Sequence, residues 1–79
     1  MMDVNEKVGE ILIDKMGIAR SQITPDANFI KDLGIDSLDY AELVMEFEKT
    51  FNIKISDRDA EKLKTIADTV SYIEEKLGQ

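Results

Sequence analysis

Apolar side chains recur along this chain at the three- and four-residue spacing of amphipathic helices. The first such stretch runs from Asp3 to about Met16 and has Gly17 as a suitable stop. Its apolar positions are Val4, Val8, Ile11 and Leu12. The last stretch has a start signal in Thr65, with Asp68 three residues later, and runs to Gly78. Its apolar positions are Ile66, Val70, Ile73 and Leu77, so the pattern predicts a helix near each end of the chain.

The longest amphipathic stretch lies between these two, from Ser37 to about Phe51. Asp36 precedes it and is a suitable cap, because its carboxylate can accept hydrogen bonds from the N–H groups of the first turn. A shorter stretch follows, in which Ser56 is the cap and the helix extends through roughly Lys62. One long and one short helix are therefore expected between the two terminal helices.

Between residues 17 and 35 the helical spacing breaks down around Pro25, Asp26 and Asn28. Apolar residues are nevertheless spread through this segment: Ile18, Ile23, Phe29, Ile30 and Leu33. We expect a long loop that these side chains fix to the core. The predicted fold is all-α, a small antiparallel bundle of three main helices and one short helix, with a long first loop.

The chain of 79 residues has room for one compact domain, so we expect residues 1–79 to form a single domain. Its 17 acidic and 10 basic residues give a formal net charge of −7. This charge repels nucleic acid and anionic lipid surfaces and attracts proteins with basic patches. The N-terminus lacks the features of a signal peptide, and no apolar stretch approaches the length of a membrane span. We expect a cytoplasmic monomer whose partners are proteins.

Histidine and cysteine are both absent. Their absence removes the usual general base, the usual zinc ligands and every Ser/His/Asp or Cys/His arrangement. Asp57 and Asp59 have the beginning of a calcium-loop spacing, but the later glycine and the bidentate glutamate of such a loop are missing. We therefore expect neither an enzyme nor a metal site.

The helix that begins at Ser37 carries two apolar arcs. One is wide enough to face the core and comprises Tyr40, Leu43, Val44, Phe47 and Phe51. The second comprises Leu38, Ala41 and Met45. Five carboxylates surround this second arc: Asp36, Asp39, Glu42, Glu46 and Glu48. An apolar centre with a polar rim is the anatomy of a transient protein interface, although contact with the long loop or a neighbouring helix would also explain Leu38 and Met45.

Ser37 is the candidate functional residue, because it is a lone hydroxyl between Asp36 and Leu38 where the loop turns into this helix. The first N–H groups of a helix are unpaired and carry a partial positive charge. A phosphate ester on Ser37 would therefore meet hydrogen-bond donors and a favourable field. This position suits an attachment point better than a catalyst.

The segment Asp32-Leu33-Gly34-Ile35-Asp36-Ser37-Leu38-Asp39, followed by Glu42-Leu43-Val44-Met45, resembles the attachment motif of bacterial acyl carrier proteins of the fatty-acid-synthesis type. The resemblance extends over nearly the whole chain, through Phe29, residues 51–57, residues 59–62 and the last helix with Tyr72 and Ile73. It implies an acyl-carrier-like fold. It also implies that a phosphopantetheinyl transferase attaches 4′-phosphopantetheine from coenzyme A to the Ser37 hydroxyl, with Asp36 as part of the motif.

The function implied by the resemblance is to carry growing acyl chains as thioesters on this arm and to deliver them to fatty acid synthesis enzymes with basic docking patches. The partner-binding residues would be Leu38, Asp39, Ala41, Glu42, Met45, Glu46 and Glu48. We expect an acyl chain to retreat among the helices beside Tyr40, Leu43, Val44, Phe47 and Ile66. The family more often has a small hydroxyl residue at the position of Tyr40, so this ring is a candidate for limiting the chain length.

Two other interpretations remain open from the sequence. The chain could be a specialised carrier, for polyketides, peptides, D-alanine or specialised lipids. It could instead be an unmodified acidic module that only binds other proteins, in which case Ser37→Ala would function normally. The motif favours primary fatty acid synthesis.

Overall fold

The computed structural model describes residues 3–79. Its elements in chain order are α1 (Val4–Met16), a 3₁₀ turn (Arg20–Gln22), α2 (Ser37–Phe51), α3 (Asp57–Lys62) and α4 (Ile66–Leu77). Within the described residues there is no strand, only an isolated antiparallel bridge between Asn28 and Thr65. The predicted all-α fold of three main helices and one short helix is confirmed.

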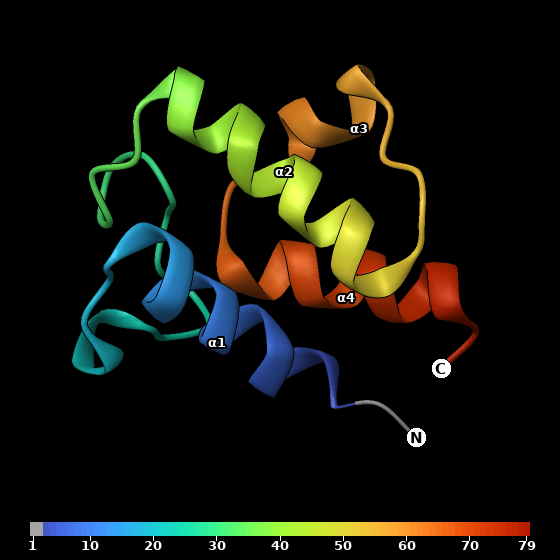
Figure 1. Cartoon of the computed structure of the whole chain (residues 1–79), viewed down its shortest axis with the longest axis horizontal. Helices are drawn as coiled ribbons and strands as arrows, with labels where there is room; N and C mark the ends of the chain where they lie inside the picture. Colours follow the sequence, from blue (N-terminus) through green and yellow to red (C-terminus); the bar gives the residue numbers. More distant parts are fainter. Residues whose placement is uncertain (1–2) are drawn as a thin grey trace.

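Helix α1 packs against both α2 and α4. In Figure 1, α1 runs opposite to α2 and α4, and these two run in roughly the same direction. This arrangement arises because residues 52–65, which include α3, lead the chain back before α4 begins. The short helix α3 lies beside α2, at the edge of the bundle away from α1.

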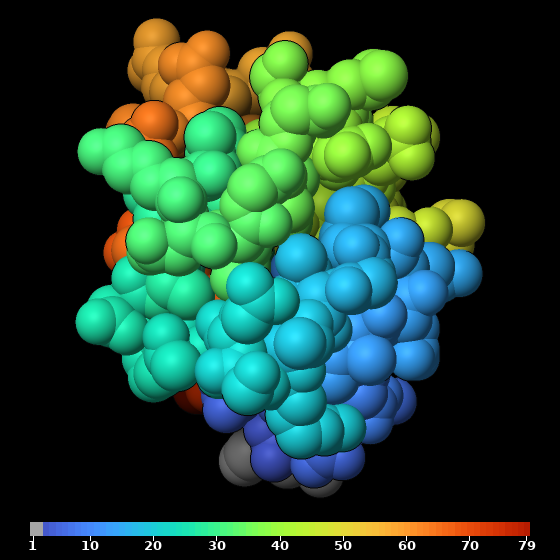
Figure 2. Space-filling model, turned by 90° about the vertical axis from the view of Figure 1, so that its left-hand side faces the viewer, coloured from blue at the N-terminus to red at the C-terminus, as the bar shows by residue number. Residues whose placement is uncertain are grey.

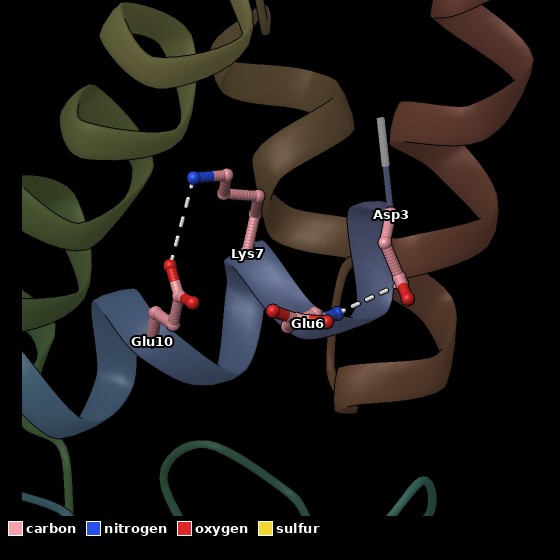
Figure 3. A network of polar contacts seen from close by, with 4 residues as sticks. All are labelled: Asp3, Glu6, Lys7 and Glu10. Carbon is pink, nitrogen blue, oxygen red and sulfur yellow. Dashed lines mark hydrogen bonds and ion pairs between the residues drawn. The ribbon is translucent and has the colours of Figure 1, made fainter. Parts of the chain in front are cut away.

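Helix α1 has the ends that the sequence predicts. Asp3 Oδ1 accepts a hydrogen bond from the Glu6 N–H at 3.1 Å, and on the exposed side Lys7 Nζ lies 3.6 Å from Glu10 Oε1 (Figure 3). Gly17 ends the helix in the left-handed conformation, with φ 68°. Such an exposed ion pair contributes little to stability, so the apolar face of α1 is what holds the helix in place.

The other three helices also begin after their predicted caps: Asp36, Ser56 and Thr65. The start of α4 is a reciprocal capping box, since Thr65 Oγ1 accepts from the Asp68 N–H and Asp68 Oδ2 accepts from the Thr65 N–H, both at 3.1 Å. Two N–H groups that would otherwise lack a partner are satisfied in this way. All four predicted helix starts are confirmed.

The core is one cluster of mainly aliphatic side chains with three phenylalanines. Both terminal helices and α2 contribute the faces predicted from the apolar spacing. The buried members of these faces are Val4, Val8, Ile11, Leu12, Leu43, Val44, Phe47, Phe51, Ile66 and Ile73. Tyr40, Val70 and Leu77 pack against the cluster but stay partly exposed. The loops add further buried residues that the pattern did not predict as core, among them Ala27, Ile35, Ile55 and Leu63.

The long loop of residues 17–35 covers one end of the bundle, where it forms the cyan and green surface of Figure 2. Phe29 and Leu33 are buried, as predicted, and Ile18 and Ile23 pack partly buried against the core. The prediction for Ile30 is wrong, because this side chain is 54% exposed. The turn that follows Asn28 points residues 29 and 33 inward and leaves residue 30 on its outer side.

Backbone hydrogen bonds join this loop to the segment between α3 and α4. The Phe29 N–H donates to Lys64 O at 3.0 Å, and the Ile66 N–H donates to Ala27 O at 3.1 Å. The Ile35 N–H in turn donates to Phe29 O at 3.0 Å, which fixes the last part of the loop. The chain just before Ser37 is thus held in place by hydrogen bonds to residues 35 and 39 positions further along, since 64 − 29 = 35 and 66 − 27 = 39.

The contribution of the α4 capping box to stability can be tested by substituting Thr65. Thr65→Ala removes the acceptor for the Asp68 N–H, so we expect it to lower the free energy of unfolding by about 0.5–2 kcal/mol. Urea unfolding followed by circular dichroism measures this change. Thr65→Ser keeps the hydroxyl and is the matched control, expected to retain most of the stability. Equal urea midpoints of unfolding for wild type and Thr65→Ala would show that the capping box contributes nothing to stability.

Candidate functional site

Ser37 is the first residue of α2 and is exposed. Gly34, with φ 69°, turns the chain toward it in a left-handed conformation that residues with side chains rarely adopt. Asp36 Oδ1 accepts from the Asp39 N–H at 2.8 Å. Among residues 3–79, no acceptor receives the N–H groups of Ser37 and Leu38. Two backbone donors therefore remain available beside the Ser37 hydroxyl, at the positive end of a helix of 15 residues.

A cleft of about 490 Å³ extends from Ser37 along one face of α2. The residues of α2 that line it recur every three or four positions: Ser37, Tyr40, Ala41, Val44, Met45 and Glu48. This stripe is about 16 Å long at 1.5 Å per residue. The volume lies within the range of about 300–1,000 Å³ that is usual for small-molecule sites. The attachment candidate and an elongated cleft thus share one helix face.

The opposite walls of the cleft come from the long loop and from α3 with its flanking residues. Phe29 and Ile30 contribute from the loop, and Ile55, Ala60 and Leu63 contribute from the α3 region. The sequence analysis did not assign these five residues to the pocket. The spacing along α2 from Ser37 to Glu48 was the one signal that could have located the cleft, and it reveals only the α2 wall.

The predicted acyl-pocket residues divide into two groups. Tyr40 and Val44 line the cleft. Leu43, Phe47 and Ile66 are almost completely buried in the core and do not line it. The reason is helical geometry, since Leu43 and Phe47 lie on the neighbouring arc of α2, turned into the core to which α1 and α4 also contribute.

Tyr40 makes the longest-range side-chain hydrogen bonds around the cleft. Its hydroxyl lies 2.7 Å from Ala60 O and 2.8 Å from Leu63 O. The single hydroxyl proton is therefore shared between these two carbonyl acceptors. The ring centroid is 5.7 Å from that of Phe29. Burial, and secondarily the negative charge of Asp68, raises the pKa of Tyr40 to about 12. The phenol therefore stays protonated and can donate throughout the physiological pH range.

The second apolar arc of α2 is exposed beside the cleft. Leu38 is 71% exposed and Met45 is 63% exposed, and neither is covered by the loop or a neighbouring helix. Together with Ile30 they are the large hydrophobic residues with high exposure in the described part of the chain. Ile30 and Met45 line the cleft, and Leu38 follows Ser37 directly. The exposed apolar surface is thus concentrated around the attachment candidate.

The carboxylates predicted to surround this arc differ in their environment. Asp39 and Glu42 are exposed, as is Ala41 between them in the apolar arc. Glu46 and Glu48 are partly buried. Glu46 Oε1 lies 3.8 Å from Lys49 Nζ, and Glu48 Oε2 accepts from the Ile55 N–H at 2.8 Å. Glu48 therefore helps to hold the segment that leads into α3, a structural contact that the sequence did not indicate.

Comparison with known proteins agrees with this geometry. The family description "Phosphopantetheine attachment site" matches residues 6–73, so the fold and site define a phosphopantetheine-carrying domain. The chain is 46% identical to the acyl carrier protein of Solidesulfovibrio magneticus, over 99% of this chain and 100% of that protein. It is 51% identical to that of Akkermansia muciniphila (95% and 94% covered) and 50% identical to that of Thermotoga maritima (96% and 94%).

The chain therefore belongs to the acyl carrier protein family. An acyl carrier role and phosphopantetheine as the cofactor follow from this membership, and both predictions are confirmed. Across residues 3–79, no helix combines the length and the apolar character needed to cross a membrane. The same residues contain no group of three or more Asp or Glu side chains that could hold a metal ion.

The raised pKa of Tyr40 leads to a prediction about alkaline pH. Above pH 10 the unfolded chain releases the phenolic proton, whereas the folded chain keeps it until about pH 12. The folded state then binds more protons than the unfolded state, so stability is intact below pH 10 and falls as the pH rises toward 12. In Tyr72→Phe, Tyr40 is the single tyrosine, and its ultraviolet absorbance reports this titration directly.

We expect phenolate absorbance to appear about two pH units above the ordinary value of 10.0, or together with loss of the helical circular dichroism signal. The same variant in concentrated denaturant is the control and should titrate near 10.0. Titration near pH 10 with an intact helical signal would contradict the burial of this hydroxyl.

Proposed function

We propose that this chain is a single carrier domain, residues 1–79, that bears 4′-phosphopantetheine on Ser37 and delivers acyl groups to the enzymes of fatty acid synthesis. In this proposal the protein is a monomer of the cytoplasm and catalyses no reaction itself. Family membership supports the carrier role, and the absence of histidine and cysteine from the sequence supports the assignment as a non-enzyme.

The observation that carries the proposal is the meeting of three features at Ser37. Its hydroxyl is exposed, two backbone N–H groups beside it are free to donate to a phosphate, and the cleft begins at the same residue. The other serines lack this combination. Ser56 Oγ already accepts from the Asp59 N–H at 3.1 Å, and Ser21 and Ser71 do not line the cleft.

When bound, the prosthetic group supplies a thiol that holds an acyl group as a thioester. The chain has no cysteine, so no protein thiol competes with it. Ser37 anchors the group, and the first turn of α2 offers N–H donors to its phosphate. The apolar walls of the cleft, which include Phe29, Val44 and Leu63, are suited to shelter a hydrocarbon chain from water.

Ser37→Ala tests the attachment site. After incubation with coenzyme A and a promiscuous phosphopantetheinyl transferase, we expect the wild-type mass to increase by one phosphopantetheine group and the mass of Ser37→Ala to stay unchanged. Intact-protein mass spectrometry makes this measurement. Ser56→Ala is the matched control, because Ser56 is also a serine at the start of a helix with an aspartate next to it. Loading of Ser37→Ala, or no loading of wild type, would refute the assignment.

The unmodified interaction module that the sequence left open is not supported by the family membership, although the exposed apolar and acidic surface of α2 would suit one. It predicts that Ser37→Ala supports every function of the wild type. A specialised carrier for polyketides, peptides or specialised lipids would load in the same way as a fatty acid carrier. Reconstitution with fatty acid synthesis enzymes distinguishes these carriers.

We also propose that partner enzymes dock on the surface of α2 next to Ser37. Leu38, Ala41 and Met45 form its apolar part, and Asp39 and Glu42 are exposed at its edge. Glu46 and Glu48 extend this acidic edge further along α2. An apolar centre with an acidic rim fits a basic partner, and the net charge of −7 would steer such a partner from a distance.

Charge reversal tests the docking surface. We expect Glu42→Lys to lower kcat/KM for the transferase by a few-fold, since an exposed ion pair is worth roughly 0.2–1 kcal/mol, and to weaken the salt dependence of the rate. Glu75→Lys on α4 changes the net charge equally, is also exposed, and is the control. Equal losses in the two variants would indicate that only the overall charge matters.

A further inference from the structure

Helix α3 is held to the bundle by two tyrosine hydroxyls. None of its six residues is fully buried, so its own side chains provide little apolar anchorage. From α2, the Tyr40 hydroxyl binds the carbonyls of Ala60 and Leu63 at 2.7 and 2.8 Å. From α4, the Tyr72 hydroxyl donates to Asp59 Oδ2 at 2.7 Å. Ile55 and Leu63, which flank α3, are buried in the core, and these polar contacts add to that anchorage in fixing α3 as one wall of the cleft.

The two tyrosines differ in their relation to the cleft. Tyr40 lines it and Tyr72 does not. At about 100° per residue, Tyr40 lies at the border between the arc of α2 that faces the cleft and the arc that faces the core. Ala41 and Val44 line the cleft on one side of this border, and Leu43 and Phe47 are buried on the other.

The side chain of Tyr40 spans the space between α2 and the end of α3. Its hydroxyl reaches the carbonyls at the α3 end, while its ring lies 5.7 Å from the ring of Phe29, measured between centroids. Phe29 is itself buried and lines the cleft. The two rings and the hydroxyl contact thus lie where the residues that line the cleft border the buried side chains of Leu43 and Phe47 on α2.

We propose that Tyr40 is a specificity-determining latch: its hydroxyl contact with Ala60 and Leu63 closes the inner side of the cleft and sets how long an acyl chain the protein can enclose. Short chains fit in the outer cleft with the latch closed. Longer chains gain further burial only by displacing Tyr40 and reaching Leu43, Phe47 and Ile66. This inference rests on the proposed function, because it requires an acyl chain that is attached at Ser37.

The latch is suited to remain closed at physiological pH. Burial favours the neutral phenol, so the donor proton is present. Opening the latch leaves Leu63 O without its partner, since no other donor among residues 3–79 contacts this carbonyl. An acyl chain must therefore compensate for a lost buried hydrogen bond before its inner carbons are sheltered.

The test compares the melting temperatures of acyl forms that differ in chain length. Wild type, Tyr40→Phe and Tyr40→Thr are loaded from the corresponding acyl coenzyme A with a promiscuous transferase, and intact mass verifies each form. The chains are butyryl, octanoyl, myristoyl and palmitoyl. In wild type we expect the gain in Tm over the unacylated form to rise to octanoyl and then to level off. In both variants we expect it to keep rising to palmitoyl.

Tyr72→Phe is the matched control, because it removes the other hydroxyl contact of α3 and leaves the cleft wall intact. It should lower every Tm but keep the wild-type dependence on chain length. A second readout is the methyl NMR spectrum, in which palmitoylation should shift Leu43 and Ile66 strongly in Tyr40→Phe and weakly in wild type. Tyr40→Phe retains the ring, so the test does not depend on whether Tyr40→Thr folds well.

Three results would overturn the latch. The wild-type gain in Tm could rise steadily to palmitoyl, the variants could level off where wild type does, or Tyr72→Phe could change the length dependence as much as Tyr40→Phe. Each of these leaves the proposed function intact, because in this experiment intact mass verifies the loading of each form before its Tm is measured. Failure of loading would instead refute the proposed function.

Discussion

The geometry of helix α2 is the constraint on which the rest of the structure depends. Its 15 residues serve three purposes at once, because different arcs of one helix face the core, the cleft and the solvent. Shifting the sequence of α2 by one residue along the helix would rotate all three surfaces together about the helix axis. Asp36 fixes this register at the first turn, and Gly34 and the Phe29–Lys64 backbone contact fix the approach of the chain. The capped start of α2 therefore positions Ser37, the cleft and the proposed docking surface relative to one another.

The helices themselves follow closely from the sequence. Periodic apolar residues and side-chain caps are local properties, so the starts at Asp3, Asp36, Ser56 and Thr65 could be predicted and are confirmed. The exposed arc around Leu38 could be predicted for the same reason. What could not be predicted depends on contacts between distant segments. The outward position of Ile30 and the walls contributed by Ile55 and Leu63 required knowledge of how the long loop and α3 pack on α2.

The acyl pocket illustrates the same limit. Apolar character could identify Leu43, Phe47 and Ile66 as buried, but it could not distinguish the closed core from the wall of a cleft. Both environments are lined by aliphatic and aromatic side chains, so composition is the same in each. In the latch that we propose, the distinction is made by the hydroxyl of Tyr40, whose partners lie 20 and 23 residues away. Single-residue patterns contain no information about such a contact.

The two sides of α2 are held by interactions of different kinds. Apolar burial joins α2 to α1, and side chains of α4 complete the same core; contacts with water cannot replace this burial when the surfaces separate. Polar contacts of Tyr40, Tyr72 and Glu48 join α3 and its leading segment to the bundle. Breaking one of these hydrogen bonds costs on the order of 1 kcal/mol, or up to about 3 kcal/mol where a buried carbonyl is left unpaired, which is less than the cost of exposing the core. We therefore expect the cleft to widen more readily on the α3 side than on the side of the α1–α2–α4 core, as the proposed latch requires.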